Sequence, residues 1–316
     1  MIRFATVGNG IATERFLEAA LKCGELAYTA ACSPSQEAAG RLAAEYGAGG
    51  CLSDLGELSR AENIDAVYID REAGLDVDQI HLLLSGGKHV LCEMLSLLGR
   101  EKLEALMQTA KTHQVCLTED LPSAWEPGFL SIQKALPRLG SLLGASFQYC
   151  RYSPEDQNTV PAASAFLDAG IHCIAPLVRL FGIPDRLTAD PVVINGSQDS
   201  SGTITASYQD MKAELLYSQV SGCRISNRIL GTDGALIFQN LSAPSHIVFY
   251  SIEGGKEIIS SHPTQSGISA QLHGWVNQIL RITDWREQME YTLMAAETIE
   301  KVDEQLEGRL SADKWA

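Results

Sequence analysis

The sequence predicts an α/β protein: a doubly wound parallel sheet, followed by an α+β domain with a large, mostly antiparallel sheet. Strand-like and helix-like segments alternate through the first 120 residues, which is typical of parallel sheets with right-handed crossovers. From residue 186 to about 259, alternating segments punctuated by glycine are typical of antiparallel strands. The rhythm changes after residue 120, so we expect domains over 1–120 and 121–316.

Composition restricts the possible partners. The net charge of −15 argues against nucleic acid and anionic membranes, because both need basic patches on the protein. No apolar run approaches the roughly 20 residues of a membrane span, and no signal-peptide pattern opens the chain. Eight scattered cysteines without a C-x-x-C pair suggest buried thiols and no metal site. We therefore expect a soluble, cytoplasmic protein.

The N-terminal segment carries the first functional signal. A strand-like run over residues 2–7 leads directly into Gly8-Asn9-Gly10 and an amphipathic helix beginning with Ile11 and Ala12. The first glycine allows a tight turn, and the second lets the backbone approach a pyrophosphate, which the helix N-terminal amides bind. The third small position is Thr13, so the fingerprint is incomplete. These five residues form the predicted nucleotide loop.

The remaining elements follow from the same periodicities. In the first domain we expect further strands over residues 26–32, 64–69, 87–92 and 115–118, and helices over 36–46, 54–59, 77–85 and 101–113. In the second domain we expect a strand over 145–151 and helices over 127–136, 166–181, 268–282 and 286–306.

Several segments, in order and spacing, resemble those of one enzyme family. The chain resembles the Gfo/Idh/MocA family of NAD(P)-dependent oxidoreductases over essentially its full length, which implies a Rossmann domain and a substrate domain. Asp168-Ala169-Gly170-Ile171-His172, for example, matches an Asp-x-Gly-x-His/Tyr motif on a long helix. The other segments are Val7–Phe16, Ile64–Ile69, Gly87–Glu93, Leu139–Gly144 and Leu230–Gly234.

The chain departs from the family where the fifth strand ends. The resemblance implies a Glu-Lys-Pro triplet there, whose lysine handles the proton of the reacting hydroxyl. This chain has Glu93-Met94-Leu95, and a methionine cannot donate or accept a proton. Glu93 either binds a ribose hydroxyl of the cofactor or holds nearby backbone amides.

Two cofactor segments also differ. By resemblance, Ile69, Asp70 and Arg71 lie along the cofactor, where the carboxylates of Asp70 and Glu72 repel a pyrophosphate unless Arg71 offsets them. After the second strand the chain has Ser33-Pro34 in place of Ser-Arg. No acidic residue there marks a ribose 2′-hydroxyl site, so the resemblance implies NAD or NADP without deciding between them.

The candidate catalytic residues are His172 and Asp168, four residues apart on one predicted helix and therefore on one side of it. As functional groups, His172 is a general acid/base and Asp168 binds substrate or orients it. The competing interpretations are a surface ion pair, or a core histidine that bonds a backbone carbonyl.

Three further residues are candidate substrate contacts. Arg151 and Tyr152 follow the first strand of the second domain and can meet an anionic substrate, or form an exposed strand end. Trp125 can cap the nicotinamide side of the pocket, or serve packing. By resemblance, the exposed face of the large sheet forms a homodimer or homotetramer interface.

The resemblance therefore implies an oxidoreductase that acts on a sugar, polyol or related alcohol, a small-molecule substrate. The alternative is a catalytically silent relative that binds a nucleotide or sugar and serves as a sensor or assembly subunit. Met94, Leu95 and the altered segment over residues 70–73 motivate this alternative.

Overall fold

The computed structural model describes residues 1–120, 125–152, 164–194, 198–260 and 267–312. The chain forms two compact units, residues 1–124 with 266–293 and residues 125–265 with 294–316. Residues 266–293 thus group with the N-terminal part, although they lie far from it in sequence. The predicted domain boundary at residue 120 stays a prediction.

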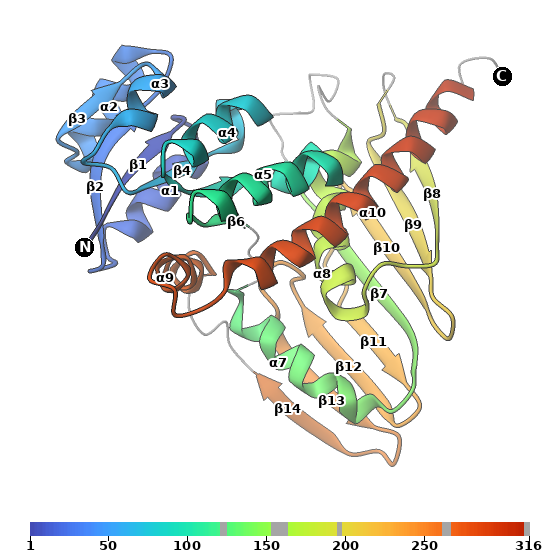
Figure 1. The fold of residues 1–316 in the computed structure, drawn as a ribbon. Helices are drawn as coiled ribbons and strands as arrows, with labels where there is room; N and C mark the ends of the chain where they lie inside the picture. Colours follow the sequence, from blue (N-terminus) through green and yellow to red (C-terminus); the bar gives the residue numbers. More distant parts are fainter. Residues whose placement is uncertain (121–124, 153–163, 195–197, 261–266, 313–316) are drawn as a thin grey trace. The chain divides into compact units, whose positions relative to one another are not determined.

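The first unit contains a six-stranded parallel sheet in the order β3-β2-β1-β4-β5-β6 (Figure 1). This confirms the predicted doubly wound fold. The strands are β1 (Ile2–Val7), β2 (Leu26–Cys32), β3 (Gly50–Leu52), β4 (Ala66–Ile69), β5 (His89–Glu93) and β6 (Leu117–Asp120). The helices are α1 (Ile11–Ala20), α2 (Gln36–Tyr46), α3 (Leu55–Arg60), α4 (Val77–Ser85), α5 (Arg100–Thr112) and α9 (Gly267–Ile279), with short 3₁₀ turns η1 (Arg71–Ala73) and η2 (Leu95–Leu98).

Aromatic packing joins α9 to this sheet. The rings of Phe16 on α1 and Tyr68 on β4 stack with centroids 3.8 Å apart, and Trp275 on α9 meets Phe16 edge-on at 6.3 Å. All three side chains are buried in one hydrophobic core. A hydrogen bond from the Thr118 hydroxyl to Gln278 Oε1, 2.7 Å long, joins β6 to the same helix. Helix α9 therefore completes the sheet's core.

The second unit contains an eight-stranded sheet in the order β14-β13-β12-β11-β7-β10-β9-β8. Its strand pairs are antiparallel except β7 with β10, which confirms the mostly antiparallel prediction. The strands are β7 (Leu142–Cys150), β8 (Arg186–Val192), β9 (Ser201–Ser207), β10 (Lys212–Ser218), β11 (Asn227–Gly231), β12 (Gly234–Gln239), β13 (Ser245–Ser251) and β14 (Lys256–Ser260).

Helices α7 (Pro127–Ala135) and α8 (Ile171–Phe181) pack on this sheet, with a 3₁₀ turn η3 (Leu136–Leu139) after α7 (Figure 1). A π-helical turn, η5 (Phe166–Gly170), precedes α8. Helix α10 (Trp285–Ala312) places its first residues in the first unit and the rest in the second. Within the described residues, no helix has the length and apolar character needed to span a membrane.

The cysteines correct one expectation. Cys150, the last residue of β7, forms a disulfide with Cys223, and their Cα atoms are 5.3 Å apart. The other six cysteines are free. The prediction of free thiols throughout is therefore wrong for this pair. No spacing rule indicated the bond, because 73 residues separate its partners and the fold brings them together.

Candidate active site

The predicted nucleotide loop connects β1 to α1. Gly8 has a φ of +114°, a conformation that glycine adopts without strain. Gly10 is the N-cap of α1, so Ile11 and Ala12 lie in the first helical turn, where backbone amides have no acceptor within the helix. This backbone fits the role predicted for Gly8, Asn9, Gly10, Ile11 and Ala12.

A carboxylate of the chain itself lies beneath this loop. Asp70 follows β4, is 1% exposed, and accepts hydrogen bonds from the Gly10 amide at 3.1 Å and the Thr13 hydroxyl at 2.5 Å. Its other oxygen accepts from the Ala73 amide at 2.9 Å. The pair of Asp70 and Thr13 explains why a hydroxyl residue stands at the third fingerprint position: the hydroxyl satisfies a buried carboxylate.

The backbone of the loop therefore has the shape that a dinucleotide needs, but the carboxylates beside it are unfavourable for a negatively charged pyrophosphate. A Cβ on Gly8 would lie 2.5 Å from Asp70 Oδ1, and one on Gly10 would collide with the Glu72 carboxylate. Only glycines leave room for these carboxylates and the loop together. The amides of Ile11 and Ala12, in the first turn of α1, can hold a pyrophosphate, while Asp70 and Glu72 oppose its charge.

Ser33 lies at the end of β2, in the region predicted to receive the adenosine part of a cofactor. It is buried, and its hydroxyl accepts from the Ser35 amide at 3.3 Å. Burial raises the pKa of the neighbouring Cys32 thiol to about 11, and the carboxylates of Asp54 and Glu57 add to this effect. The strand end is thus in a negative electrostatic environment.

Glu93 ends β5, and Ile69 ends β4 beside it. Glu93 Oε2 accepts from the Arg71 amide at 3.0 Å, and the nearby Tyr68 hydroxyl also lowers the Glu93 pKa. Burial nevertheless raises the Glu93 pKa, and Asp70 contributes to the rise. Met94 follows in a left-handed conformation with a φ of +59°, which is sparsely populated for residues other than glycine.

The sequence prediction did not include two carboxylates at the end of β6 among the site residues. Strand β6 ends at Asp120, two residues later than predicted, so Glu119 and Asp120 belong to the strand. Glu119 is fully buried and accepts from the Ser96 amide at 2.8 Å and hydroxyl at 2.7 Å, which holds the turn after Met94. Asp120 retains some exposure and is paired in register with Glu93. Consecutive acids at the end of an apolar run are the signal that sequence reasoning could have used.

The second unit brings together three predicted site residues, Asp168, Arg151 and His172, and two that the sequence prediction missed, Gln219 and Tyr149. Asp168 lies in the π-helical turn η5 and accepts from Gln219 Nε2 at 3.2 Å. Arg151 Nη1, just after β7, lies 3.7 Å from the other Asp168 oxygen. Turns of π-helix inside helices occur frequently at functional sites.

His172 lies in the first turn of α8, and its ring packs against Tyr149 with centroids 4.3 Å apart. Tyr149 and Arg151 are two residues apart at the end of β7, so both project from one side of the strand. Burial raises the Tyr149 pKa. His172 and Asp168 therefore contact the same strand end. Tyr152 is 47% exposed, and the indole nitrogen of Trp125 is buried with no hydrogen-bond partner among the described residues.

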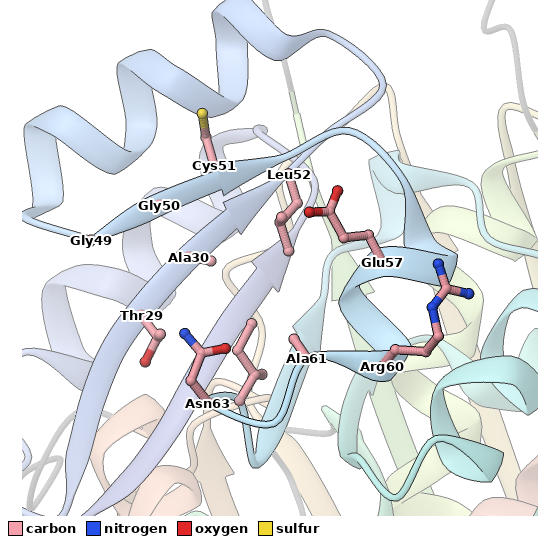
Figure 2. Close-up of a pocket in the computed structure, with 11 residues that line it drawn as sticks. Thr29, Ala30, Gly49, Gly50, Cys51, Leu52, Glu57, Arg60, Ala61 and Asn63 are labelled. Atoms are coloured by element: carbon pink, nitrogen blue, oxygen red, sulfur yellow. The ribbon is translucent and has the colours of Figure 1, made fainter.

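Two cavities of the first unit lie away from these residues. One, of about 510 Å³, lies beside the middle of β2 and is bordered by β3 and α3; Figure 2 shows Thr29 and Asn63 on one side, Glu57 and Arg60 on the other. The second, of about 530 Å³, lies at the start of β5 beside His89 and the end of α9. Neither contains a predicted site residue.

One cluster among the described residues has ligand atoms close enough to hold a metal ion: Cys23, Glu25 and His273, all within 4.8 Å of one another. Burial, followed by the hydrogen bond to Glu25, raises the pKa of the Cys23 thiol, which disfavours the thiolate that binds metals. We assign no metal to this cluster.

Comparison with known proteins agrees with the glycine loop and the parallel sheet. The model of the Gfo/Idh/MocA family, an oxidoreductase family with an NAD-binding Rossmann fold, matches residues 2–121. The scyllo-inositol 2-dehydrogenase (NADP⁺) IolU of Bacillus subtilis is 32% identical over 271 residues, which cover 82% of this chain and 83% of that protein. The chain belongs to the Gfo/Idh/MocA family.

Other similar proteins agree with this assignment. The uncharacterized oxidoreductase YgjR of Escherichia coli is 32% identical over 260 residues, 79% of each chain. The 3-ketoreductase KijD10 from Actinomadura kijaniata, solved with NADP, has a TM-score of 0.80 at 19% identity and covers 96% of each chain. The UDP-N-acetylglucosamine 3-dehydrogenase GnnA from Acidithiobacillus ferrooxidans has a TM-score of 0.82 at 16% identity, with 98% of this chain and 99% of that one covered. At these identities the two solved structures support the fold alone.

Proposed function

We propose that this member of the Gfo/Idh/MocA family is an NAD(P)-dependent oxidoreductase that acts on a hydroxyl group of a sugar, polyol or related alcohol. The similarity to IolU, which extends over four-fifths of both chains, is the main support. The Gly8–Ala12 backbone, which fits a pyrophosphate, supports the cofactor part of the proposal. A silent sensor or assembly subunit gains no support from these relatives.

In this proposal the amides of Ile11 and Ala12 hold the pyrophosphate, and the segment Ile69–Arg71 with Glu93 borders the cofactor. The cofactor supplies a hydride acceptor or donor. NAD and NADP both stay candidates, although IolU is NADP-dependent by name. The carboxylates of Asp54 and Glu57 near the end of β2 oppose a 2′-phosphate, which favours NAD.

The proposed proton-exchanging residue is His172, which takes the hydroxyl proton during oxidation and returns it during reduction. The Tyr149 ring restrains the imidazole. Asp168, held by Arg151 and Gln219, binds or orients the substrate. Arg151, Tyr152 and Trp125 are the proposed substrate contacts. One general acid/base contributes about 10²–10⁴-fold to the rate.

Calorimetric titration with NAD(H) and NADP(H), followed by turnover assays with inositols, sugars and other polyols, tests the proposal. We expect micromolar to millimolar binding of one cofactor and turnover with at least one polyol. His172→Ala should lower turnover about 100-fold or more while cofactor affinity stays the same. Absence of cofactor binding at millimolar concentration would contradict the proposal.

A further inference from the structure

The ends of β5 and β6 place two carboxyl groups next to the position where the resemblance implies a lysine. We propose that Glu93 and Asp120 form a carboxylate–carboxylic acid pair that donates a hydrogen bond to the reacting oxygen of the substrate. This inference rests on the proposed function and adds a second catalytic group to it, since Met94 has no proton to donate.

The sheet register brings the two residues together. Glu93 and Asp120 are the last residues of neighbouring parallel strands and are direct register partners. Such strands lie about 4.8 Å apart, and side chains paired in this way project from the same face of the sheet. In open α/β sheets, ligands bind outside the carboxyl ends of the strands, where this pair lies. The family model, with its NAD-binding fold, spans both residues.

Accessibility separates this pair from the third carboxylate nearby. Glu93 and Asp120 each retain accessible surface, whereas Glu119 is fully buried. Glu119 is also bonded to Ser96, so it supports the turn after β5 and cannot meet a ligand. Only Glu93 and Asp120 can therefore contact a substrate from these strand ends.

Different partners make one member the acid and the other the base. Glu93 accepts a hydrogen bond from the Arg71 amide, and this bond and the nearby Tyr68 hydroxyl both favour its ionised form. The nearby Gln271 side chain lowers the Asp120 pKa, but it is outweighed by other effects. Burial, and next the Glu93 charge, raise the Asp120 pKa to about 7. With its pKa at about 7, Asp120 carries a proton in a large part of the molecules at neutral pH, so it is the acid of the pair.

The charged groups around Glu93 and Asp120 affect the pKa values of both carboxyl groups. Towards Glu93, the charges are Asp70, which raises its pKa, and Arg71, which lowers it. Towards Asp120, they are Glu93 and, more weakly, Glu119, while Gln271 on α9 is neutral. Within the described part of the chain, negative groups outnumber positive ones here, so a proton is retained at a pH where an isolated aspartate is ionised.

A neutral acid at Asp120 suits the chemistry. During oxidation of an alcohol, the hydride leaves to the dinucleotide, the hydroxyl proton goes to the general base, and negative charge develops on the oxygen. A carboxylic acid donates a hydrogen bond to this oxygen, whereas an ionised carboxylate repels it. Activity of the pair therefore requires its proton, and turnover should fall as the pH rises above about 7.

The test uses the variants Asp120→Ala and Asp120→Asn, with Asp78→Asn on the exposed face of α4 as control. Asp120→Ala should lower turnover about 100-fold, with the dinucleotide dissociation constant within a factor of two of wild type. Asp120→Asn keeps a donor, so it should lose less turnover than Asp120→Ala and lack the decline above pH 7. The control should keep both the rate and the decline.

Infrared spectroscopy of the ligand-free protein gives a readout independent of activity. We expect a carboxylic acid C=O band that titrates near pH 7 in wild type and in Asp78→Asn, and that disappears in Asp120→Asn. If this band is absent from wild type, or if Asp120→Asn keeps the wild-type pH profile, the inference is wrong. A protein that shows the band but binds no dinucleotide would instead contradict the proposed function.

Discussion

The carboxylate of Asp70 accepts a hydrogen bond from the backbone amide of Gly10, 3.1 Å away, at the N-terminus of α1. The positive end of this helix therefore already faces a negative charge of the chain. The Thr13 hydroxyl completes the arrangement at 2.5 Å. This relationship links the incomplete glycine fingerprint to the carboxylates after β4: the two departures from the family pattern are parts of one hydrogen-bonded network.

Neutralising Asp70 should strengthen dinucleotide binding. Asp70→Asn keeps an acceptor for Gly10 and removes a charge near the pyrophosphate, which we expect to lower the dissociation constant about 10-fold. The same change removes the acceptor of the Ala73 amide, so a loss of roughly 1–2 kcal/mol in unfolding free energy should accompany it. Calorimetry and urea denaturation measure the two effects.

The exposed variant Asp78→Asn, which alters the net charge equally, should leave the affinity unchanged. A dissociation constant that does not move in Asp70→Asn would show that solvent or Arg71 screens this carboxylate from the cofactor.

The fold could be predicted largely from sequence because hydrophobic periodicity is local. Helix α4, for example, was predicted with its observed bounds, Val77–Ser85. The parts of the fold that depend on contacts between residues far apart in the sequence could not be predicted in this way. Strand β3 has only three residues, α9 joins the first unit through Trp275, and Asp120 meets Glu93 only through the sheet register. Of the predicted site residues, structure adds partners to Asp70, Asp168 and His172, while their roles stay proposals.

Glu119 should make stability depend on pH. Burial raises its pKa from 4.5 to about 6, so the folded state binds its proton more tightly than the unfolded state. The native protein therefore loses stability as the pH rises from about 4 to about 6, and this loss persists at higher pH. Glu119→Gln removes the loss, and its amide can donate to Thr292, whose hydroxyl has no partner among the described residues.

We expect Glu119→Gln to gain on the order of 2 kcal/mol in unfolding free energy at pH 8 and almost nothing at pH 4. Urea denaturation at both values measures the difference. The exposed Glu101→Gln on α5 is the matched control and should show no such pH dependence. An equal effect of Glu119→Gln at both pH values would contradict the explanation.

The Cys150–Cys223 disulfide should stabilise the second unit by restricting its unfolded state. A closed loop of 73 residues predicts about 4 kcal/mol in the chain-entropy estimate. The double variant Cys150→Ser/Cys223→Ser should therefore lose roughly this amount, and reductant should affect wild type but not the variant. Cys51→Ser, at a free and partly exposed thiol, is the control.

Alkylation of the unreduced, denatured chain tests the bond directly and should label six cysteines. Labelling of all eight would contradict the bond.

The open face of the large sheet should mediate assembly between copies of the chain. Ile258, Val248, Ile237 and Arg228 follow one another across β14, β13, β12 and β11 as register partners, so they form one row on the face opposite buried Leu236. An apolar row that ends in a charge suits a contact with a second copy of the chain, the dimer or tetramer interface that the family resemblance implied.

Ile237→Glu places a charge within this face, and burying it unpaired costs several kcal/mol. We expect light scattering to show an oligomer for wild type and a dissociation constant raised at least ~100-fold for Ile237→Glu. Leu82→Glu, a similar change on exposed α4, should leave assembly intact. A wild-type monomer at micromolar concentration would overturn the prediction.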